Sequence, residues 1–198
     1  MFIDVRLSQA AADAVAQVVP QLVADKVASR IFAKDASLWG AAAQAEAEIR
    51  LGWVTSPTDS QHLIEPILQL RSTLSDRGVS RIVLCGMGGS SLAPEVITQS
   101  AGVELVVLDS TEPEQVAAAV NKDLEKTAVV VSSKSGSTVE TDSQKRAFEA
   151  AFDAAGIAKT ERIVIVTDPG SPMEQKAKQE IKGMFGSYVS PQLVEKLV

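Results

Sequence analysis

Apolar positions recur at helical spacing in the first part of the chain. Over residues 7–23 they fall three or four positions apart, and the same spacing returns over residues 63–74. This spacing predicts two amphipathic helices. Residues 53–60, between them, contain the Pro, Ser and Asp that are typical of a loop. We therefore expect an N-terminal helical segment over residues 1–78 that packs on the remainder of the chain.

Beyond residue 80 the apolar positions form short continuous runs instead. These runs are rich in Val and Ile, and helical stretches separate them; they lie at residues 82–85, 105–108, 128–131 and 163–166. Strands that are apolar on both faces and alternate with helices indicate a parallel sheet covered on both sides. The pattern predicts a doubly wound α/β domain with a mainly parallel sheet over residues 79–172.

A loop rich in small and hydroxyl residues follows the first expected strand, and another follows the third. The first is Gly86–Ser91 and the second is Ser133–Thr138. Each precedes an expected helix, so backbone N–H groups, hydroxyls and a positive helix end converge, which favours phosphate. In a flavodoxin-like strand order, 2-1-3-4, the first and third strands are neighbours at the switch point. The sequence therefore predicts one phosphate site between the two loops.

The candidate ligand residues come from these two loops. A hydrogen bond to a charged oxygen contributes about 1.5 to 3 kcal/mol, so several hydroxyls together can hold a phosphorylated metabolite. We expect the site to contain Gly89, Ser90, Ser133, Lys134, Ser135, Ser137 and Thr138.

Other interpretations of the same residues stay open. Ser and Thr also cap ordinary helices, which explains any single hydroxyl here. Lys134 fits either a phosphate contact or a solvated loop, and Glu140 fits either a helix cap or a support for a loop hydroxyl. The dinucleotide fingerprint G-x-G-x-x-G is incomplete because Ser91 stands at its last glycine, although the acidic Asp109 after the second strand fits that alternative.

Composition and charge exclude several classes. The net charge of −6 and the lack of a long basic run argue against a nucleic-acid partner. Cys85 is the only cysteine, which excludes an internal disulfide and a cysteine-cluster metal site, and it fits a buried strand. Charged residues interrupt the apolar residues 1–30, so we expect no signal peptide, no membrane partner and a cytoplasmic protein. His62 is expected to be an ordinary surface or packing residue.

Two motifs carry a resemblance to a known family. Residues Leu84–Glu95 and Ser133–Thr141 resemble the sugar-isomerase (SIS) domain, and specifically the N-terminal part of bacterial glucose-6-phosphate isomerases; the similarity extends over residues 51–172. It implies interconversion of glucose 6-phosphate and fructose 6-phosphate through a cis-enediol, in glycolysis and gluconeogenesis, without a metal or organic cofactor. It also implies that Ser133, Ser135 and Thr138 bind the phosphate while Gly89 and Ser90 line the pocket.

The chain departs from that family in two respects. Many members carry Thr-Phe-Thr-Thr after the Ser-Lys pair, whereas Ser135–Thr138 has the form common to smaller sugar-phosphate isomerases, so another phosphosugar isomerase remains an alternative. The family's enediol base, arginine and ring-opening group lie in later segments that are not present. We identify no catalytic residue and expect a truncated part that binds a phosphorylated hexose without turnover, with a homodimer left open.

Residues 173–198 form an expected C-terminal helical tail of uncertain origin. Residues 181–198 are similar to the segment that precedes the catalytic domain of class III adenylate and guanylate cyclases. This similarity favours a second alternative, a non-enzymatic phosphosugar-sensing module that signals through the tail. The simpler interpretation is an amphipathic turn capped by Ser190, with Pro191 at its first position.

Overall fold

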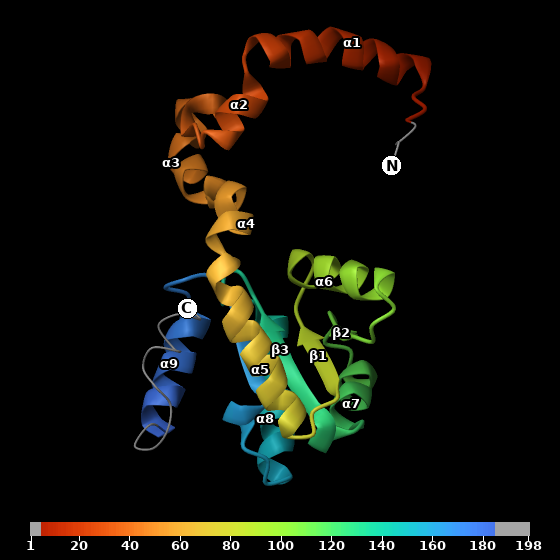
Figure 1. Cartoon of the computed structure of the whole chain (residues 1–198), viewed down its shortest axis with the longest axis vertical. Coiled ribbons are helices and arrows are strands. Elements are labelled where there is room, and N and C mark those ends of the chain that lie inside the picture. The colour runs from red at the N-terminus through yellow and green to blue at the C-terminus, as the bar shows by residue number, and fades with distance from the viewer. Residues whose placement is uncertain (1–4, 185–198) are drawn as a thin grey trace. The chain divides into compact units, whose positions relative to one another are not determined.

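The computed structural model describes residues 5–184 (Figure 1). The contacts within the chain divide it into two units, one ending at Ile64 and the other beginning at Glu65. The division places most of the helix over residues 64–76 with the sheet. The expected boundaries at residues 78 and 172 stay predictions. The predicted Ser190 cap lies outside the described residues.

The N-terminal unit consists of short helices and 3-10 turns. They are α1 (Gln9–Ala24), α2 (Val27–Phe32), η1 (Ala36–Trp39), α3 (Ala41–Arg50), η2 (Leu51–Thr55), α4 (Ser56–Asp59) and η3 (Gln61–Leu63). Ser8 caps α1 by accepting a hydrogen bond from the N–H of Ala11. The core of this unit is small: Ala36, Ala47 and Leu51 are its buried apolar residues.

The loop predicted over residues 53–60 is wrong. Those residues continue η2 and then form α4, so the chain is helical there. Pro57 explains the error because it lies in the first turn of α4, where its missing N–H has no helical partner to lose. A Pro-Ser-Asp stretch at this place therefore starts a helix instead of interrupting one.

The second unit alternates helices and strands. Its elements are α5 (Ile64–Asp76), β1 (Arg81–Cys85), α6 (Gly89–Ser100), β2 (Val106–Leu108), α7 (Pro113–Asn121), η4 (Leu124–Lys126), β3 (Thr127–Ser132), α8 (Val139–Ala154), η5 (Lys159–Glu161), β4 (Ile163–Val166) and α9 (Pro172–Met184). The four strands lie side by side in the order β2-β1-β3-β4 and every pair is parallel (Figure 1). The predicted doubly wound fold and its strand order are confirmed.

The sheet is buried on one face, whereas on the other face Ile82 and Val130 are only half-buried, so the burial predicted from the continuous apolar runs is confirmed for one face. One face carries Val83 and Val129, which are completely buried under a core completed by α7, α8 and α9. The two aromatic side chains of that core, Phe148 and Phe152, come from α8 and have ring centroids 6.2 Å apart. Alternate strand residues point to the opposite face, where Leu84 is also buried.

Arg81 ties the amino end of the sheet together. Its guanidinium donates to the carbonyl oxygens of Ala119 and Lys122 and to Thr127 Oγ1, at 2.7 to 3.0 Å. These contacts join β1 to β3 and to the C-terminal end of α7. Helix ends of this kind favour a cation. Across the part of the chain that is described, no helix combines the length and apolar character needed to cross a membrane.

Candidate phosphate site

The carboxyl ends of three strands meet closely at one edge of the sheet. The N–H of Gly86, after β1, donates to the carbonyl oxygen of Leu108 at the end of β2 at 3.2 Å. A Cβ at Gly86 would lie 3.2 Å from the carbonyl oxygen of Ser132 at the end of β3, and 3.3 Å from the Cβ of Ser90. Glycine therefore allows the first loop to approach the end of β3, which brings the two hydroxyl loops to the same edge.

The first loop turns sharply into α6. Gly88 has φ +56°, a left-handed value that favours glycine, and α6 begins at the next residue. Gly89 is exposed and Ser90 is half-buried on the first turn of α6. Ser91 is buried instead, and its hydroxyl donates to the carbonyl oxygen of Gly88 at 3.1 Å. Of the two serines in this loop, Ser90 is the more accessible.

The second loop holds its hydroxyls in two pairs. The inner pair is Ser133 and Thr138, whose oxygens lie 3.1 Å apart, and Ser133 Oγ also accepts the N–H of Gly136 at 3.2 Å. The outer pair is Ser135 and Ser137, whose oxygens also lie 3.1 Å apart. Ser133 is buried, whereas both members of the outer pair are exposed. The outer hydroxyls are therefore more accessible to solvent than the inner Ser133 hydroxyl.

Helix α8 starts directly after this loop. Thr138 is its N-cap residue, yet the Thr138 side chain makes no capping hydrogen bond. The N–H groups of the first turn thus remain available to an anion, which the positive end of the helix also favours. Lys134, in the same loop, is exposed. The Glu140 side chain is exposed and makes no hydrogen bond with the described residues, so neither role predicted for it is seen here.

A third segment, which sequence reasoning missed, borders the second loop. It is the turn between β4 and α9, residues 167–171. The N–H of Asp168 donates to the carbonyl oxygen of Lys134 at 3.2 Å. A Cβ built on Gly136 would lie 2.7 Å from the Cβ and the Oγ of Ser171. The sequence did contain a signal for Ser171, because Ser-Pro-x-Glu is typical of a helix N-terminus.

The structure places His62 at the surface and Cys85 in the core, as the sequence predicted. His62 is exposed in the N-terminal unit, and its Nδ1 lies 2.6 Å from the carbonyl oxygen of Asp59. Cys85 is fully buried, and burial raises the pKa of its thiol to about 12. Within residues 5–184 the structure shows no cluster of three His, Cys, Asp or Glu side chains suited to a metal ion.

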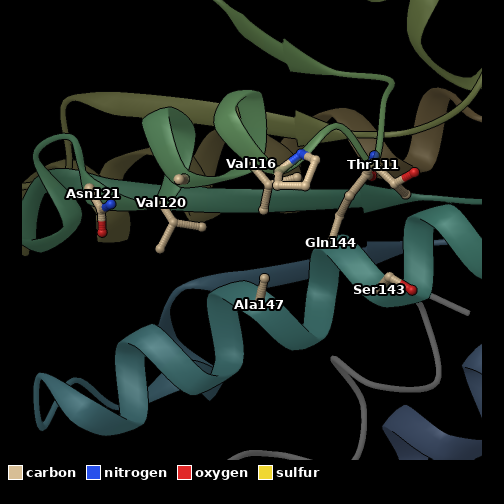
Figure 2. A pocket seen from close by; sticks show the side chains of 9 residues that line it. Thr111, Val116, Val120, Asn121, Ser143, Gln144 and Ala147 are labelled. Atoms are coloured by element: carbon tan, nitrogen blue, oxygen red, sulfur yellow. The ribbon is translucent and has the colours of Figure 1, made fainter.

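A groove between α7 and α8 is a second concave feature that the sequence did not reveal. Its volume is about 450 Å³. Figure 2 shows the side chains that line it, which are Thr111, Pro113, Val116, Ala117, Val120, Asn121, Ser143, Gln144 and Ala147. Gln144 is buried, and its Nε2 donates to the carbonyl oxygen of Ser110 at 3.0 Å. Because no charged side chain lines the groove, it is not suited to phosphate.

The fold and the loops define a parallel α/β domain whose strand ends carry hydroxyl side chains and a helix N-terminus. No family model matches the chain. Among curated proteins it is 33% identical over 106 residues to glucose-6-phosphate isomerase of Chlamydia trachomatis serovar L2, covering 50% of this chain and 20% of that enzyme. It is also 33% identical over 109 residues to the enzyme of Synechococcus sp. strain JA-3-3Ab, with 51% and 20% covered.

Solved structures give a consistent result. A crystal structure of glucose-6-phosphate isomerase from Chlamydia trachomatis D/UW-3/Cx matches with TM-score 0.51 and 32% identity, over 60% of this chain and 25% of that one. A hypothetical protein from Thermus thermophilus matches with TM-score 0.63 and 29% identity, over 85% and 39%. The chain thus spans about a fifth of the length of the curated relatives. The predicted resemblance to part of glucose-6-phosphate isomerase is confirmed.

Proposed function

We propose that this chain is the phosphosugar-binding part of a glucose-6-phosphate isomerase, built on a SIS domain, and that its sheet edge binds the phosphate of glucose 6-phosphate or fructose 6-phosphate. The observation that carries the proposal is the meeting of the two hydroxyl loops at one edge, with Gly86 close to both Ser90 and the end of β3. The similarity to glucose-6-phosphate isomerases supports the choice of ligand.

Each predicted site residue has a role in this proposal. The exposed Ser135 and Ser137 donate to the phosphate directly, and Lys134 supplies positive charge beside them. The inner pair, Ser133 and Thr138, completes the hydroxyl set, and Gly89 and Ser90 line the opposite side of the pocket. Backbone N–H groups at the start of α8 add donors that carry no side-chain entropy cost.

Holding the phosphate orients the reacting end of the sugar. Binding energy from a remote group positions C1 and C2 for proton transfer between them, which is the chemistry of aldose-ketose isomerisation. That transfer needs a carboxylate base and a cation to stabilise the enediolate. The proposed residues offer hydroxyls and one lysine but no carboxylate, so we expect this chain to bind without turnover. The proposal needs no metal or organic cofactor, and its setting is the cytoplasm.

A specific observation favours a second candidate, another phosphosugar isomerase. Gly136 has φ +65° and its missing Cβ would fall 2.7 Å from Ser171. Any side chain at position 136 is therefore excluded from this loop shape. Because many glucose-6-phosphate isomerases carry phenylalanine at this point of the motif, the glycine that this loop requires favours the smaller enzymes, which act on other sugar phosphates.

Ligand-dependent thermal stabilisation tests the phosphate site. Because a ligand bound only by the folded state stabilises it by mass action, glucose 6-phosphate and 6-phosphogluconate should raise the melting temperature, and glucose should not. Ser135→Ala combined with Ser137→Ala should weaken binding by about 2 to 4 kcal/mol, since two charge-assisted hydrogen bonds are lost. Ser100→Ala, at an exposed serine of α6, is the matched control. An equal response to glucose would reject the proposal.

A coupled assay for fructose 6-phosphate tests the expected lack of turnover. The chain should form none, even when glucose 6-phosphate saturates binding. Robust isomerisation would contradict this expectation and direct the search for a base to the carboxylates of Glu95, Glu140 and Asp168.

A further inference from the structure

We propose that the turn between β4 and α9, residues 167–171, sets the shape of the hydroxyl loop over residues 133–138, and that Ser171 is its positioning residue. The ligand part of this inference rests on the proposed function, whereas the structural part does not. Ser171 itself is buried and offers no hydroxyl to a ligand.

The contact between Ser171 and Gly136 is the tightest approach made by any glycine of the described residues. A Cβ on Gly136 would lie 2.7 Å from both Ser171 Cβ and Ser171 Oγ, and 3.0 Å from the Cβ of Met173. Distances this short leave no room for any side chain at position 136. The loop thus passes against Ser171 with its backbone, and the position of Ser171 limits where the loop can lie.

Ser171 is itself held from several directions. Its hydroxyl lies 2.8 Å from Thr167 Oγ1 and accepts the N–H of Glu174 at 3.1 Å, which caps the start of α9. The Glu174 carboxylate in turn accepts the N–H of Gly170 and pairs with Lys178. The hydrogen bond from Lys178, followed by that from Gly170, lowers the pKa of Glu174. The turn is therefore a rigid support and not a free loop.

Backbone hydrogen bonds join the end of β4 and the same turn to the start of the hydroxyl loop. The N–H of Ser133 donates to the carbonyl oxygen of Val166 at 3.0 Å, and the N–H of Asp168 donates to that of Lys134 at 3.2 Å. Ser133 then holds the N–H of Gly136 through its hydroxyl. A shift of the turn consequently moves the inner hydroxyl and the glycine together, which changes the spacing of the whole hydroxyl set.

Reciprocal substitutions in the full chain test this coupling. Gly136→Ala introduces both the steric conflict and the strain of a positive φ. Gly156→Ala is the matched control, because Gly156 has φ +68° and open space around its missing Cβ. Ser171→Gly removes the opposing side chain, and glycine is well tolerated at a helix N-cap. We expect Gly136→Ala to lower the melting temperature more than Gly156→Ala, and Gly136→Ala with Ser171→Gly to recover at least half of that excess.

Amide hydrogen exchange measures the shape of the loop without any ligand. Ser171→Gly should speed exchange of the Gly136 N–H at least tenfold, because the backbone loses the surface it rests on. Ser110→Gly is the control: Ser110 Oγ also accepts a turn N–H, that of Glu112, but lies in the turn after β2. Unchanged exchange at Gly136 in Ser171→Gly, or no recovery in the double variant, would overturn the proposal.

The affinity for glucose 6-phosphate, measured on folded protein, is not changed by a general loss of stability and therefore tests the positioning role directly. At a temperature where every variant is folded, Gly136→Ala should bind at least tenfold more weakly than Gly156→Ala, and the double variant should regain most of that loss. Equal affinity of Gly136→Ala and Gly156→Ala would overturn the positioning role. If the wild-type chain does not respond to glucose 6-phosphate, the proposed function fails, while the exchange measurement still decides whether Ser171 shapes the loop.

Discussion

The two units of this chain are stabilised in different ways. The sheet unit has a core in which Val83, Val129 and Phe148 are completely buried and come from segments far apart in the sequence. The core of the N-terminal unit consists of Ala36, Ala47 and Leu51, two of which are small. Hydrophobic stabilisation is roughly proportional to the apolar area removed from water. The N-terminal unit therefore gains less hydrophobic stabilisation than the sheet unit, although it is almost entirely helical.

In the N-terminal unit, side-chain hydrogen bonds between neighbouring helical turns add to the stabilisation from its small core. Gln9 bonds to Asp13 and Gln44 to Glu48, each one helical turn apart. Pairs of this kind add only about 0.2 to 0.5 kcal/mol each. Helix α1 has no buried residue. We therefore expect the N-terminal unit to open at a lower free energy than the sheet unit.

Two phenylalanines provide the strongest test of this difference. Phe148 is completely buried in the sheet unit, whereas Phe32 is 73% exposed in the N-terminal unit. Phe148→Ala should lower the free energy of unfolding of the sheet unit by about 3 to 5 kcal/mol, because it removes buried apolar area and leaves a cavity. Phe32→Ala should change stability by less than about 0.5 kcal/mol. Denaturant unfolding followed by circular dichroism measures both, and similar losses would remove the contrast.

Two ion pairs have the same i,i+4 spacing but differ in burial, so comparing them isolates the effect of burial on stability. Lys145 and Glu149 are paired at 2.5 Å with side chains 4% and 15% exposed, whereas Arg50 and Glu46 are paired at 2.6 Å with 53% and 65% exposed. Glu149→Gln removes the negative charge that Glu149 places beside the buried Lys145, and should cost about 3 kcal/mol. Glu46→Gln should cost about 0.5 kcal/mol or less. If chemical denaturation gives equal losses in the free energy of unfolding for the two variants, burial does not make the Lys145–Glu149 pair more important than the exposed pair.

Lowering the pH should destabilise the N-terminal unit through protonation of Asp35, with a smaller effect on stability than the substitutions above. Hydrogen bonds from Arg30, then from Ser37, lower the pKa of Asp35 from 3.8 to about 2. Because the folded pKa is depressed, the stabilisation is complete above the unfolded value and is lost as the pH falls from 3.8 towards 2. Asp35→Asn should flatten the pH dependence of the melting temperature in that window. A carboxyl resonance of Asp35 that titrates at its ordinary value would contradict this assignment.

The sheet was predictable because its signals are local. Each strand is a short apolar run bounded by polar residues, and the strands lie within one residue of the predicted runs. The strand order was chosen because the flavodoxin-like order is one of the two common orders for such sheets, and no local signal in the sequence specifies it. The helical turn at Ser56–Asp59 was missed because proline ends some helices and starts others, and only its position within the turn decides which.

The candidate site was predictable only in part, because some of its signals are local in the sequence and others depend on contacts between distant residues. The two loops are visible in the sequence because glycine and hydroxyl residues cluster there. The contact of Gly136 with Ser171 is not visible, since it joins residues 35 positions apart and depends on how β3 and β4 pair. The α7–α8 groove was missed in the same way, because its lining combines residues from two helices.

Because Cys85 is buried, its reaction with a thiol reagent reports when the sheet unit unfolds. It is the only cysteine, it lies at the end of β1 in the sheet unit, and burial raises the pKa of its thiol to about 12. A thiol reagent requires an accessible thiolate. The rate of labelling therefore measures how often the central strands separate, and fraying of the N-terminal helices does not change it. Mass spectrometry of the labelled chain thus distinguishes unfolding of the sheet unit from unfolding of the N-terminal unit.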